Sequence, residues 1–315
     1  MNLDRVRTFA AVAQTGSFSE AARRLKISQS AVSQQIRSLE NELRQTLFAR
    51  DRRSVGLTLA GNRLLVASQD VLHAWNEFLD KTQPSGRDIS GPLSIGTSAS
   101  ATAYLWAPVY RAFSLRHPRV EMDIRSMAAT QDSIDAVLSG GLDVAFAPLP
   151  LTAPRLETRL LGVQRALISV SSDHPLVKKR KLRREDFLGE QFILYKSSMA
   201  FRWLTDAFFE REHFQPLVAL ETNDTHFIRA MVEVGCGIGF LPDWSLIGDR
   251  HKRVRVLSYG APLVQELGLA YRRSSVSRAA KCFIDFCVAH RELIPNSAKA
   301  VADHSRGISR RHRSR

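Results

Sequence analysis

Cysteine is scarce in this chain, and its scarcity argues against a disulfide-stabilised fold. The 315 residues contain three cysteines, Cys236, Cys282 and Cys287, whereas small secreted domains held by disulfides are rich in cysteine. Cys282 and Cys287 lie in an apolar stretch with helical periodicity, and no histidine or cysteine pair nearby completes a zinc site. We therefore expect buried free thiols, no metal site and no cofactor.

Long hydrophobic runs are also missing. No uninterrupted apolar stretch approaches the roughly 18 residues that indicate a membrane-spanning helix. The N-terminus, Met1–Arg5, does not open an apolar signal sequence. We expect a cytoplasmic protein without a membrane partner.

The common enzyme motifs are missing as well. The sequence contains no GxSxG elbow, no HExxH pair and no Walker A loop. Gly235–Gly239 is glycine-rich but lacks the context of a phosphate-binding loop, and no serine or cysteine nucleophile is marked for His213 or His226. We expect structural or surface histidines, no catalytic residues and no enzymatic activity.

Positive charge, by contrast, is in excess. Lysine and arginine number 45 against 31 acidic residues, for a net charge of +14. Residues 1–58 carry ten basic and five acidic side chains, and residues 296–315 carry six and one. This concentration at the two ends favours nucleic acid as a partner, although a basic balance also serves solubility alone. We expect the basic tail, which has almost no apolar residues, to be disordered.

The first third of the chain has the pattern of a helix-turn-helix. Apolar residues recur at helical spacing from Leu3 to Ala13, Gly16 ends that helix, and Ser17 with Glu20 forms a capping box for a second one. Ser28 is a suitable N-cap for a third helix.

The third helix has one face suited to reading DNA. Its apolar stripe contains Val32, Ile36 and Leu39. The opposite face carries Gln29, Ser30, Ser33, Gln34 and Arg37. Amides and hydroxyls near a helix N-terminus suit base edges in the major groove, and a guanidinium suits guanine or phosphate. The alternative is an ordinary solvated face, but such faces usually mix Glu and Lys.

A basic hairpin and a long helix follow. Leu47–Leu57 has apolar anchors around a basic tip, in which Arg50, Arg52 and Arg53 are placed to contact the DNA backbone; the alternative is a solvated hairpin. Thr58 then caps a helix that continues to about Lys81. Its apolar positions favour helix-on-helix dimerisation, with packing against its own chain as the alternative.

Residues 2–64 resemble the N-terminal domain of LysR-type transcriptional regulators. The matching stretches include 9–13, 16–22, 27–36, 47–48 and 57–61. One departure is Arg44, where the family often ends the recognition helix with glycine. A left-handed cap is costlier for arginine, so we expect a different turn into the wing and an added phosphate contact from Arg44.

The remaining residues alternate between strands and helices, which predicts parallel sheets covered on both faces. Chain crossings near 161–168 and 264–270 indicate two α/β lobes joined by a hinge. This part resembles the LysR effector domain. The resemblance rests on Asp143, His174–Leu176 and the 235–242 segment. The expected fold class is α/β, with a winged helix-turn-helix, a long linker helix and a two-lobed Rossmann-like domain similar to type 2 periplasmic binding proteins.

Hydroxyl-rich loops occur where strands lead into helices, which is where open α/β sheets bind ligands. The candidate effector-binding residues are Thr97, Ser98, Ser100, Thr130, Ser197, Ser198 and Thr225. Such residues suit a small anion, whereas the alternative for each one singly is plain helix capping.

These observations predict a transcription regulator that binds double-stranded promoter DNA and a small anionic effector. The expected parts are a DNA-binding domain at 1–58, a linker helix and hinge at 59–90, an effector domain at 91–295 and a tail at 296–315. The resemblance implies a homodimer or a homotetramer, with RNA polymerase as a further partner. Two other classes stay open: a solute-binding module whose N-terminal domain docks protein, and an enzyme built on the α/β body.

Overall fold

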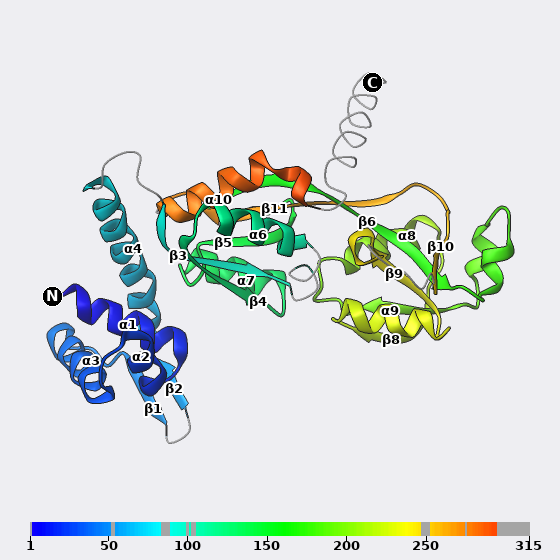
Figure 1. Cartoon of the computed structure of the whole chain (residues 1–315). Helices are drawn as coiled ribbons and strands as arrows, with labels where there is room; N and C mark the ends of the chain where they lie inside the picture. Colours follow the sequence, from blue (N-terminus) through cyan, green and yellow to red (C-terminus); the bar gives the residue numbers. More distant parts are fainter. Residues whose placement is uncertain are drawn as a thin grey trace.

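The computed structural model describes residues 2–51, 54–82, 89–98, 101, 105–246, 253–274 and 276–294. Its N-terminal part is a helix-turn-helix with a wing and a long helix (Figure 1). The elements are α1 (Leu3–Thr15), α2 (Phe18–Leu25), α3 (Gln29–Leu43), β1 (Phe48–Asp51), β2 (Ser54–Leu57) and α4 (Leu59–Thr82). The bounds agree with the sequence-based expectation to within a few residues.

The helical periodicity of the first 43 residues buries one stripe of each helix. Phe9, Val32 and Ile36 are fully buried in a common cluster with Phe48 of the wing. The rings of Phe9 and Phe48 lie 5.5 Å apart between centroids. The wing is therefore anchored by its first strand to the core of the three helices.

The predicted helix boundaries form with one change in the capping. Gly16 ends α1 in the left-handed conformation, and Ser17 caps α2 by accepting from the amide of Glu20 at 3.3 Å. In a full capping box the Glu20 carboxylate would also accept from the amide of Ser17. In the structure this carboxylate pairs with Arg23 instead. The capping box is thus only half formed.

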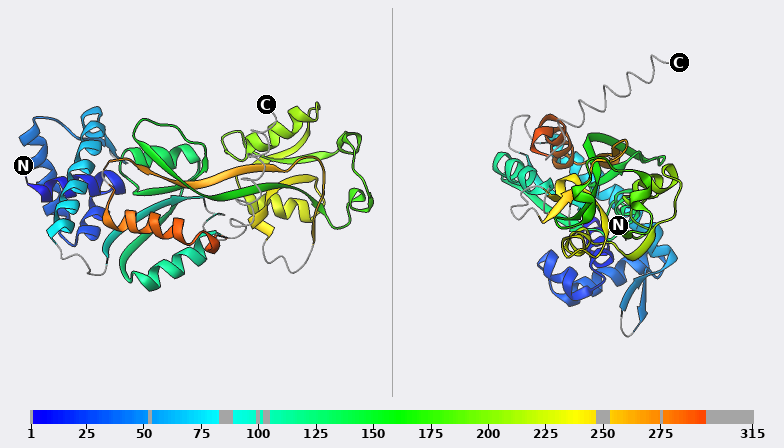
Figure 2. Two further views of the ribbon diagram at one scale, coloured as in Figure 1. Left: turned by 90° about the horizontal axis from the view of Figure 1, so that it is seen from above. Right: turned by 90° about the vertical axis from the view of Figure 1, so that its right-hand side faces the viewer.

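The C-terminal part is a mixed sheet with helices on its faces. Its first lobe contains β3 (Ser90–Thr97), α6 (Ala107–Arg116), β4 (Arg119–Ser126), α7 (Thr130–Leu138), β5 (Val144–Leu149) and α10 (Arg278–Ala289). Its second lobe contains β7 (Gln191–Tyr195), α8 (Arg202–Arg211), β8 (Leu217–Thr222), α9 (Thr225–Glu233), β9 (Ile238–Pro242) and β10 (Val254–Val256). Two long strands, β6 (Leu156–Ser171) and β11 (Leu263–Arg272), join the lobes (Figure 2).

The strand order is β4-β3-β5-β11-β6-β9-β7-β8, with β10 paired to β6. Within each lobe the local pairs are parallel, β3 with β4 and β5, and β7 with β8 and β9. The expectation of parallel sheets is wrong at the centre, where β6 and β11 are antiparallel. The reason is that the chain enters the second lobe along β6 and returns along β11, so the two crossings run in opposite directions.

Each lobe has its own aromatic core. Trp106 and Phe113 pack against Phe283 of α10 in the first lobe. Phe192, Phe208 and Phe240 are among the buried residues of the second. Each lobe thus has its own buried cluster, and the long strands β6 and β11 run between the two.

The three cysteines are free, but their burial differs from the expectation. Cys287 is buried in the first lobe, Cys282 is only partly buried, and Cys236 is exposed. Cys236 follows α9 in a turn, and Cys282 lies on α10 with its Sγ 3.4 Å from His117 Nε2. The expectation of buried thiols, made for Cys282 and Cys287, is therefore right for Cys287 and only partly right for Cys282.

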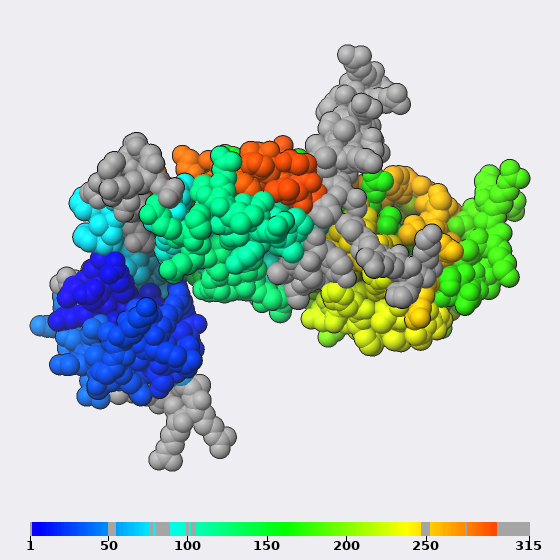
Figure 3. All heavy atoms as spheres, in the orientation of Figure 1, coloured from blue at the N-terminus to red at the C-terminus, as the bar shows by residue number. Residues whose placement is uncertain are grey.

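The winged domain lies at one end of the molecule beside the first lobe, and the second lobe lies at the other end (Figure 3). An ion pair connects α4 to the first lobe, with Arg272 Nη1 2.7 Å from Asp70 Oδ1. Only 6% of the Arg272 side chain is exposed. Across the described residues, the helices are all too short or too polar to cross a membrane.

Candidate nucleic-acid interface and effector cleft

Helix α3 presents the predicted polar face to solvent. Val32, Ile36 and Leu39 are buried against the domain core. Of the five candidate base-reading residues, four are exposed and Ser33 is partly buried; the exposed ones are Gln29, Ser30, Gln34 and Arg37. Sequence periodicity alone located this face, because a helix that buries one stripe must expose the other.

Two of these side chains are held by short-range hydrogen bonds. Ser28 caps α3 by accepting from the amide of Ala31 at 3.1 Å, and its hydroxyl lies 2.9 Å from that of Ser30. Ser19 of α2 donates to Gln29 Oε1 at 3.1 Å. The N-terminal end of this polar face of α3 is thereby attached to α2. This attachment limits the freedom of its side chains before DNA binds.

Glu40 has a structural role on the same helix. Its carboxylate accepts from the amides of Leu47 and Phe48, at 2.8 and 3.3 Å. These bonds fix the connection from α3 to the wing, so the Glu40 carboxylate points to the start of the wing.

Arg44 adopts the left-handed conformation that the sequence argued against. Its φ is 53°, and its amide and that of Gln45 close the helix end onto the carbonyls of Asn41 and Glu40. The expected different turn is therefore wrong: the usual left-handed cap forms although arginine is a costly residue for it. The Arg44 side chain is exposed, and its predicted phosphate contact stays a prediction.

Substituting Arg44→Gly is expected to stabilise the winged domain. Relief of the left-handed penalty, about 1–2 kcal/mol, exceeds the entropy cost of glycine, about 0.5–1 kcal/mol. A net gain of roughly 0.5–1 kcal/mol should appear in urea unfolding of the full chain. The matched control is Arg37→Gly in the middle of α3, which should lose about 1 kcal/mol. A loss of stability in both variants would contradict the argument.

The wing forms as predicted from the apolar residues on both sides of its basic tip. Strands β1 and β2 pair in antiparallel register, with Arg50 opposite Val55. Arg52, Arg53 and the side chain of Arg50 lie outside the described residues. Their contacts with the DNA backbone stay predictions.

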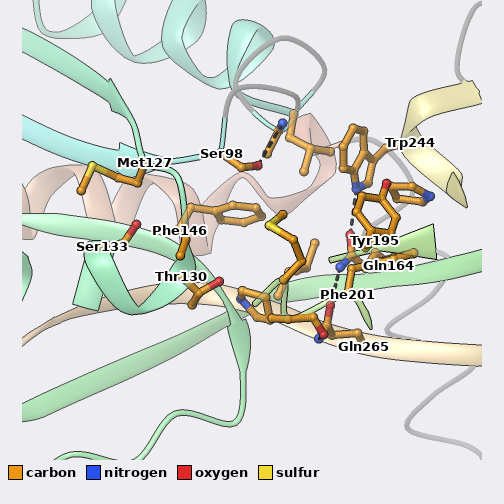
Figure 4. A pocket seen from close by; sticks show the side chains of 18 of the residues that line it. Ser98, Met127, Thr130, Ser133, Phe146, Gln164, Tyr195, Phe201, Trp244 and Gln265 are labelled. Atoms are coloured by element: carbon orange, nitrogen blue, oxygen red, sulfur yellow. Dashed lines mark hydrogen bonds between the residues drawn. The ribbon is translucent and has the colours of Figure 1, made fainter. Parts of the chain in front are cut away.

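A cleft opens between the two lobes (Figure 4). The first lobe contributes Ser98, Met127, Thr130 and Phe146, and the second contributes Tyr195, Phe201 and Trp244. Its volume is about 90 Å³, which is small beside the roughly 300–1,000 Å³ of typical ligand sites. A ligand here is either small or requires the lobes to separate.

A buried amide network forms the floor of the cleft at the lobe crossing. Gln164 of β6 and Gln265 of β11 are cross-strand partners, and the Gln164 amide donates to Gln265 Oε1 at 2.5 Å. The indole of Trp244, in the short helix Asp243–Leu246, donates to Gln164 Oε1 at 2.9 Å (Figure 4). This network joins both crossing strands to the second lobe.

The described lining of the cleft is uncharged. It consists of hydroxyls, amides, aromatic rings and aliphatic side chains. Burial raises the pKa of the Tyr195 phenol, which therefore stays neutral and donates to Thr225 Oγ1 at 2.9 Å. Burial also raises the pKa of Asp243, next to Trp244. A ligand in this cleft meets dipoles and hydroxyls rather than a charged side chain.

The structure brings only part of the predicted effector set together. Ser98 and Thr130 line the cleft. Thr97 is buried and accepts from the Trp106 indole at 3.1 Å, and Thr225 accepts from the phenol of Tyr195, which lines the cleft. Ser100 lies outside the described residues.

Ser197 and Ser198 are outside the described lining of the lobe cleft. They are exposed in the turn before α8, and the same loop contributes Met199, Ala200 and Phe201 to the cleft instead. Hydroxyl side chains after a strand are a recognisable pattern, whereas the apolar residues next to them carry no such local signal. Gln164 and Gln265 were also missed, because no local motif distinguishes a strand glutamine at a lobe crossing.

Both parts of this architecture match known protein families. Residues 3–62 match the family described as "Bacterial regulatory helix-turn-helix protein, lysR family", and residues 86–292 match "LysR substrate binding domain". The chain belongs to the LysR family. The expected fold class and function class are confirmed: a LysR-type transcription regulator binds DNA through its helix-turn-helix and responds to a small effector.

Several LysR-type proteins are similar over most of their length. The regulator ShiR of Corynebacterium glutamicum is 30% identical over 245 residues, covering 76% of this chain and 81% of ShiR. The regulator AlsR of Bacillus subtilis is 29% identical, covering 77% and 80%. A full-length OxyR variant from Pseudomonas aeruginosa is 22% identical with a TM-score of 0.79, covering 94% and 96%. CbnR in complex with its target DNA is 20% identical with a TM-score of 0.60, covering 92% and 100%. The structural likenesses support the fold.

Proposed function

We propose that this LysR-type regulator reads promoter bases with Gln29, Ser30, Ser33, Gln34 and Arg37. The observation that carries the proposal is the exposed, acid-free polar face at the start of α3, opposite the buried stripe. Amides and hydroxyls there have donors and acceptors for base edges, and Arg37 suits guanine. Arg50, Arg52 and Arg53 of the wing hold the phosphate backbone.

The dimer forms through α4 and is the unit that recognises a partly palindromic site. Val71, Trp75 and Phe78 of α4 are exposed in the single chain, and the Trp75 and Phe78 rings stack with 5.6 Å between centroids. Large apolar side chains on a long helix favour a helix-on-helix interface.

The parts of the chain are a DNA-binding domain at 1–58, a linker at 59–90, an effector domain at 91–295 and a tail at 296–315. The protein acts in the cytoplasm without catalysing a reaction.

The effector of the lobe cleft is a small monocarboxylic acid with an apolar body. Ser98 and Thr130 offer hydroxyls, and Thr130 begins α7, whose N-terminal amides favour an anion. Met127, Phe146 and Phe201 offer the apolar surface. Because both lobes line the cleft, binding favours one lobe arrangement, by no more than the effector's differential affinity for the two arrangements.

Mapping of bound sites across the genome, followed by footprinting with purified protein, tests the regulator proposal. A protected, partly palindromic site with steep salt dependence is expected. A solute-binding module that docks protein would protect no site, and an enzyme would convert the cleft ligand. Either result would contradict the proposal.

A Thr130→Val variant tests the effector site. It should weaken the response of promoter binding to the effector by roughly ten- to hundredfold in effector concentration, because a hydrogen bond to a charged group contributes about 1.5–3 kcal/mol. Affinity for DNA without effector should be unchanged. Small monocarboxylic acids and their amides are compared by fluorescence anisotropy on the mapped site. The matched control is Ser197→Ala, outside the cleft; an equal effect of both variants, or equal potency of the amides, contradicts the proposal.

A further inference from the structure

A second and larger cleft lies where the winged domain meets the first lobe. Its volume is about 560 Å³, within the range of small-molecule sites. The winged domain contributes α1, α2 and α4, and the first lobe contributes β3, β4, the turn after α7 and the start of α10. We call it the junction cleft; its polar lining includes Arg7, Arg24, Gln69, Asp123, Arg125 and Arg278.

Gln69 of α4 is the unusual group in this cleft. The residue is 3% exposed. Both its Oε1 and its Nε2 are buried without a hydrogen-bond partner among the described residues. Gly140 allows this position, since a Cβ there would stand 2.7 Å from Gln69 Oε1. Buried carboxamides nearly always have partners, so an unpartnered one at a cleft points to a ligand that supplies both a donor and an acceptor.

The charges around Gln69 favour an anion. The acids are already engaged: Asp123 Oδ2 accepts from Arg125 at 2.8 Å, and Asp143 Oδ2 accepts from the amide and hydroxyl of Ser94 at 2.8 and 2.7 Å. Arg278 begins α10 and has no ionic partner among the described residues, while Arg24 donates to the neutral Gln14. Guanidinium groups with spare donors suit a carboxylate.

We propose that the junction cleft binds a small dicarboxylic acid that also carries a hydroxyl or amino group. Arg278 and, across the cleft, Arg24 hold the carboxylates, whereas Arg7 in the same lining pairs with Asp4 Oδ1 at 3.7 Å. Gln69 Nε2 donates to the ligand, and Gln69 Oε1 accepts from its hydroxyl or amino group. The site is distinct from the lobe cleft, whose described lining holds no arginine.

Such a ligand would join the winged domain to the first lobe. Gln69 is adjacent in sequence to Asp70, which pairs with Arg272 at the end of β11. A ligand that bridges α4 and α10 therefore strengthens an existing contact between the two domains. Bound acid would hold the DNA-binding helices in one orientation and alter affinity for the promoter.

L-malate and succinate are matched probes, because they differ by one hydroxyl. Titration calorimetry of the full chain at constant ionic strength should show malate binding about tenfold tighter than succinate, the effect of roughly one hydrogen bond.

Gln69→Leu should remove this preference for malate. Its ligand-free melting temperature should be unchanged or higher, because the substitution removes two buried polar atoms that have no partner among the described residues. Arg278→Ala should weaken both acids at least fivefold. Arg111→Ala, exposed on α6, and Thr130→Val in the lobe cleft should change neither affinity.

Three results overturn the proposal. They are no binding of either acid beyond that of chloride, a preference for malate that survives Gln69→Leu, and a loss of binding in Thr130→Val. Should Gln69→Leu fail to fold, Arg278→Ala decides, and unchanged affinity in that variant overturns the site. Promoter footprinting is independent of these titrations, so failure here is distinguishable from failure of the regulator proposal.

Discussion

Replacing Arg37 with alanine is expected to weaken binding to the mapped promoter site by about 1–3 kcal/mol, or roughly five- to 150-fold. Arg37 is exposed on α3, outside the buried stripe of Val32, Ile36 and Leu39. In the proposed complex, this guanidinium enters the major groove and donates two hydrogen bonds to one guanine. The loss should be concentrated on the specific sequence, because a base contact is lost and phosphate contacts remain.

The measurement is fluorescence anisotropy with the promoter duplex and with a random duplex of equal length, at several salt concentrations. Arg23→Ala is the matched control, since Arg23 is exposed on α2 and pairs with Glu20. Affinity for random DNA and the salt slope should be nearly unchanged in Arg37→Ala. An equal loss on both duplexes would make Arg37 a phosphate residue, with a salt slope smaller by about one.

Gly268→Ala is expected to destabilise the effector domain by roughly 3 kcal/mol, at the upper end of overpacking effects. A Cβ at this position would lie 2.4 Å from the carbonyl oxygen of Arg159 and 2.6 Å from Leu149 Cδ1. The first of these atoms belongs to the backbone of the partner strand and cannot rotate away. The pairing of β11 with β6 also shifts register between Leu267 and Gly268, so the alanine would strain the lobe crossing itself.

Differential scanning calorimetry of the full chain should show the affected transition lowered by roughly 6–12 °C, at about 2–4 °C per kcal/mol for a domain of this size. Gly56→Ala in the wing is the control, because a Cβ there meets nothing within 4 Å. The two variants add the same methyl group to a strand. Equal and small shifts would show that the crossing strands yield easily, and would remove the reason to treat this bulge as a rigid joint.

The reading face could be predicted from the sequence because it depends on local periodicity. Val32, Ile36 and Leu39 recur at helical spacing, and that spacing fixes which side of α3 faces out. The cap at Arg44 shows the limit of this reasoning. Local propensity disfavours a left-handed arginine, but the contacts of Glu40 with the amides of Leu47 and Phe48 require the chain to turn there.

The lobe cleft could be predicted only in outline. Ser98 and Thr130 were found because hydroxyls after strands follow a general rule for open sheets. Gln164 and Gln265 are 101 positions apart in the chain and meet only because β6 and β11 are cross-strand neighbours. No pattern within a short window of sequence carries that pairing.

The sequence by itself determined the helix-turn-helix, the alternation of strands and helices, and the concentration of charge at the chain ends. Each of these is set by residues a few positions apart, through helical and strand periodicity. Only the tertiary structure decided the antiparallel crossing of the lobes, the uncharged lining of their cleft, and the placing of Gln69 between α4 and the first lobe. Those features depend on which distant segments pack together, and packing is chosen by the burial of the whole chain rather than by any one segment.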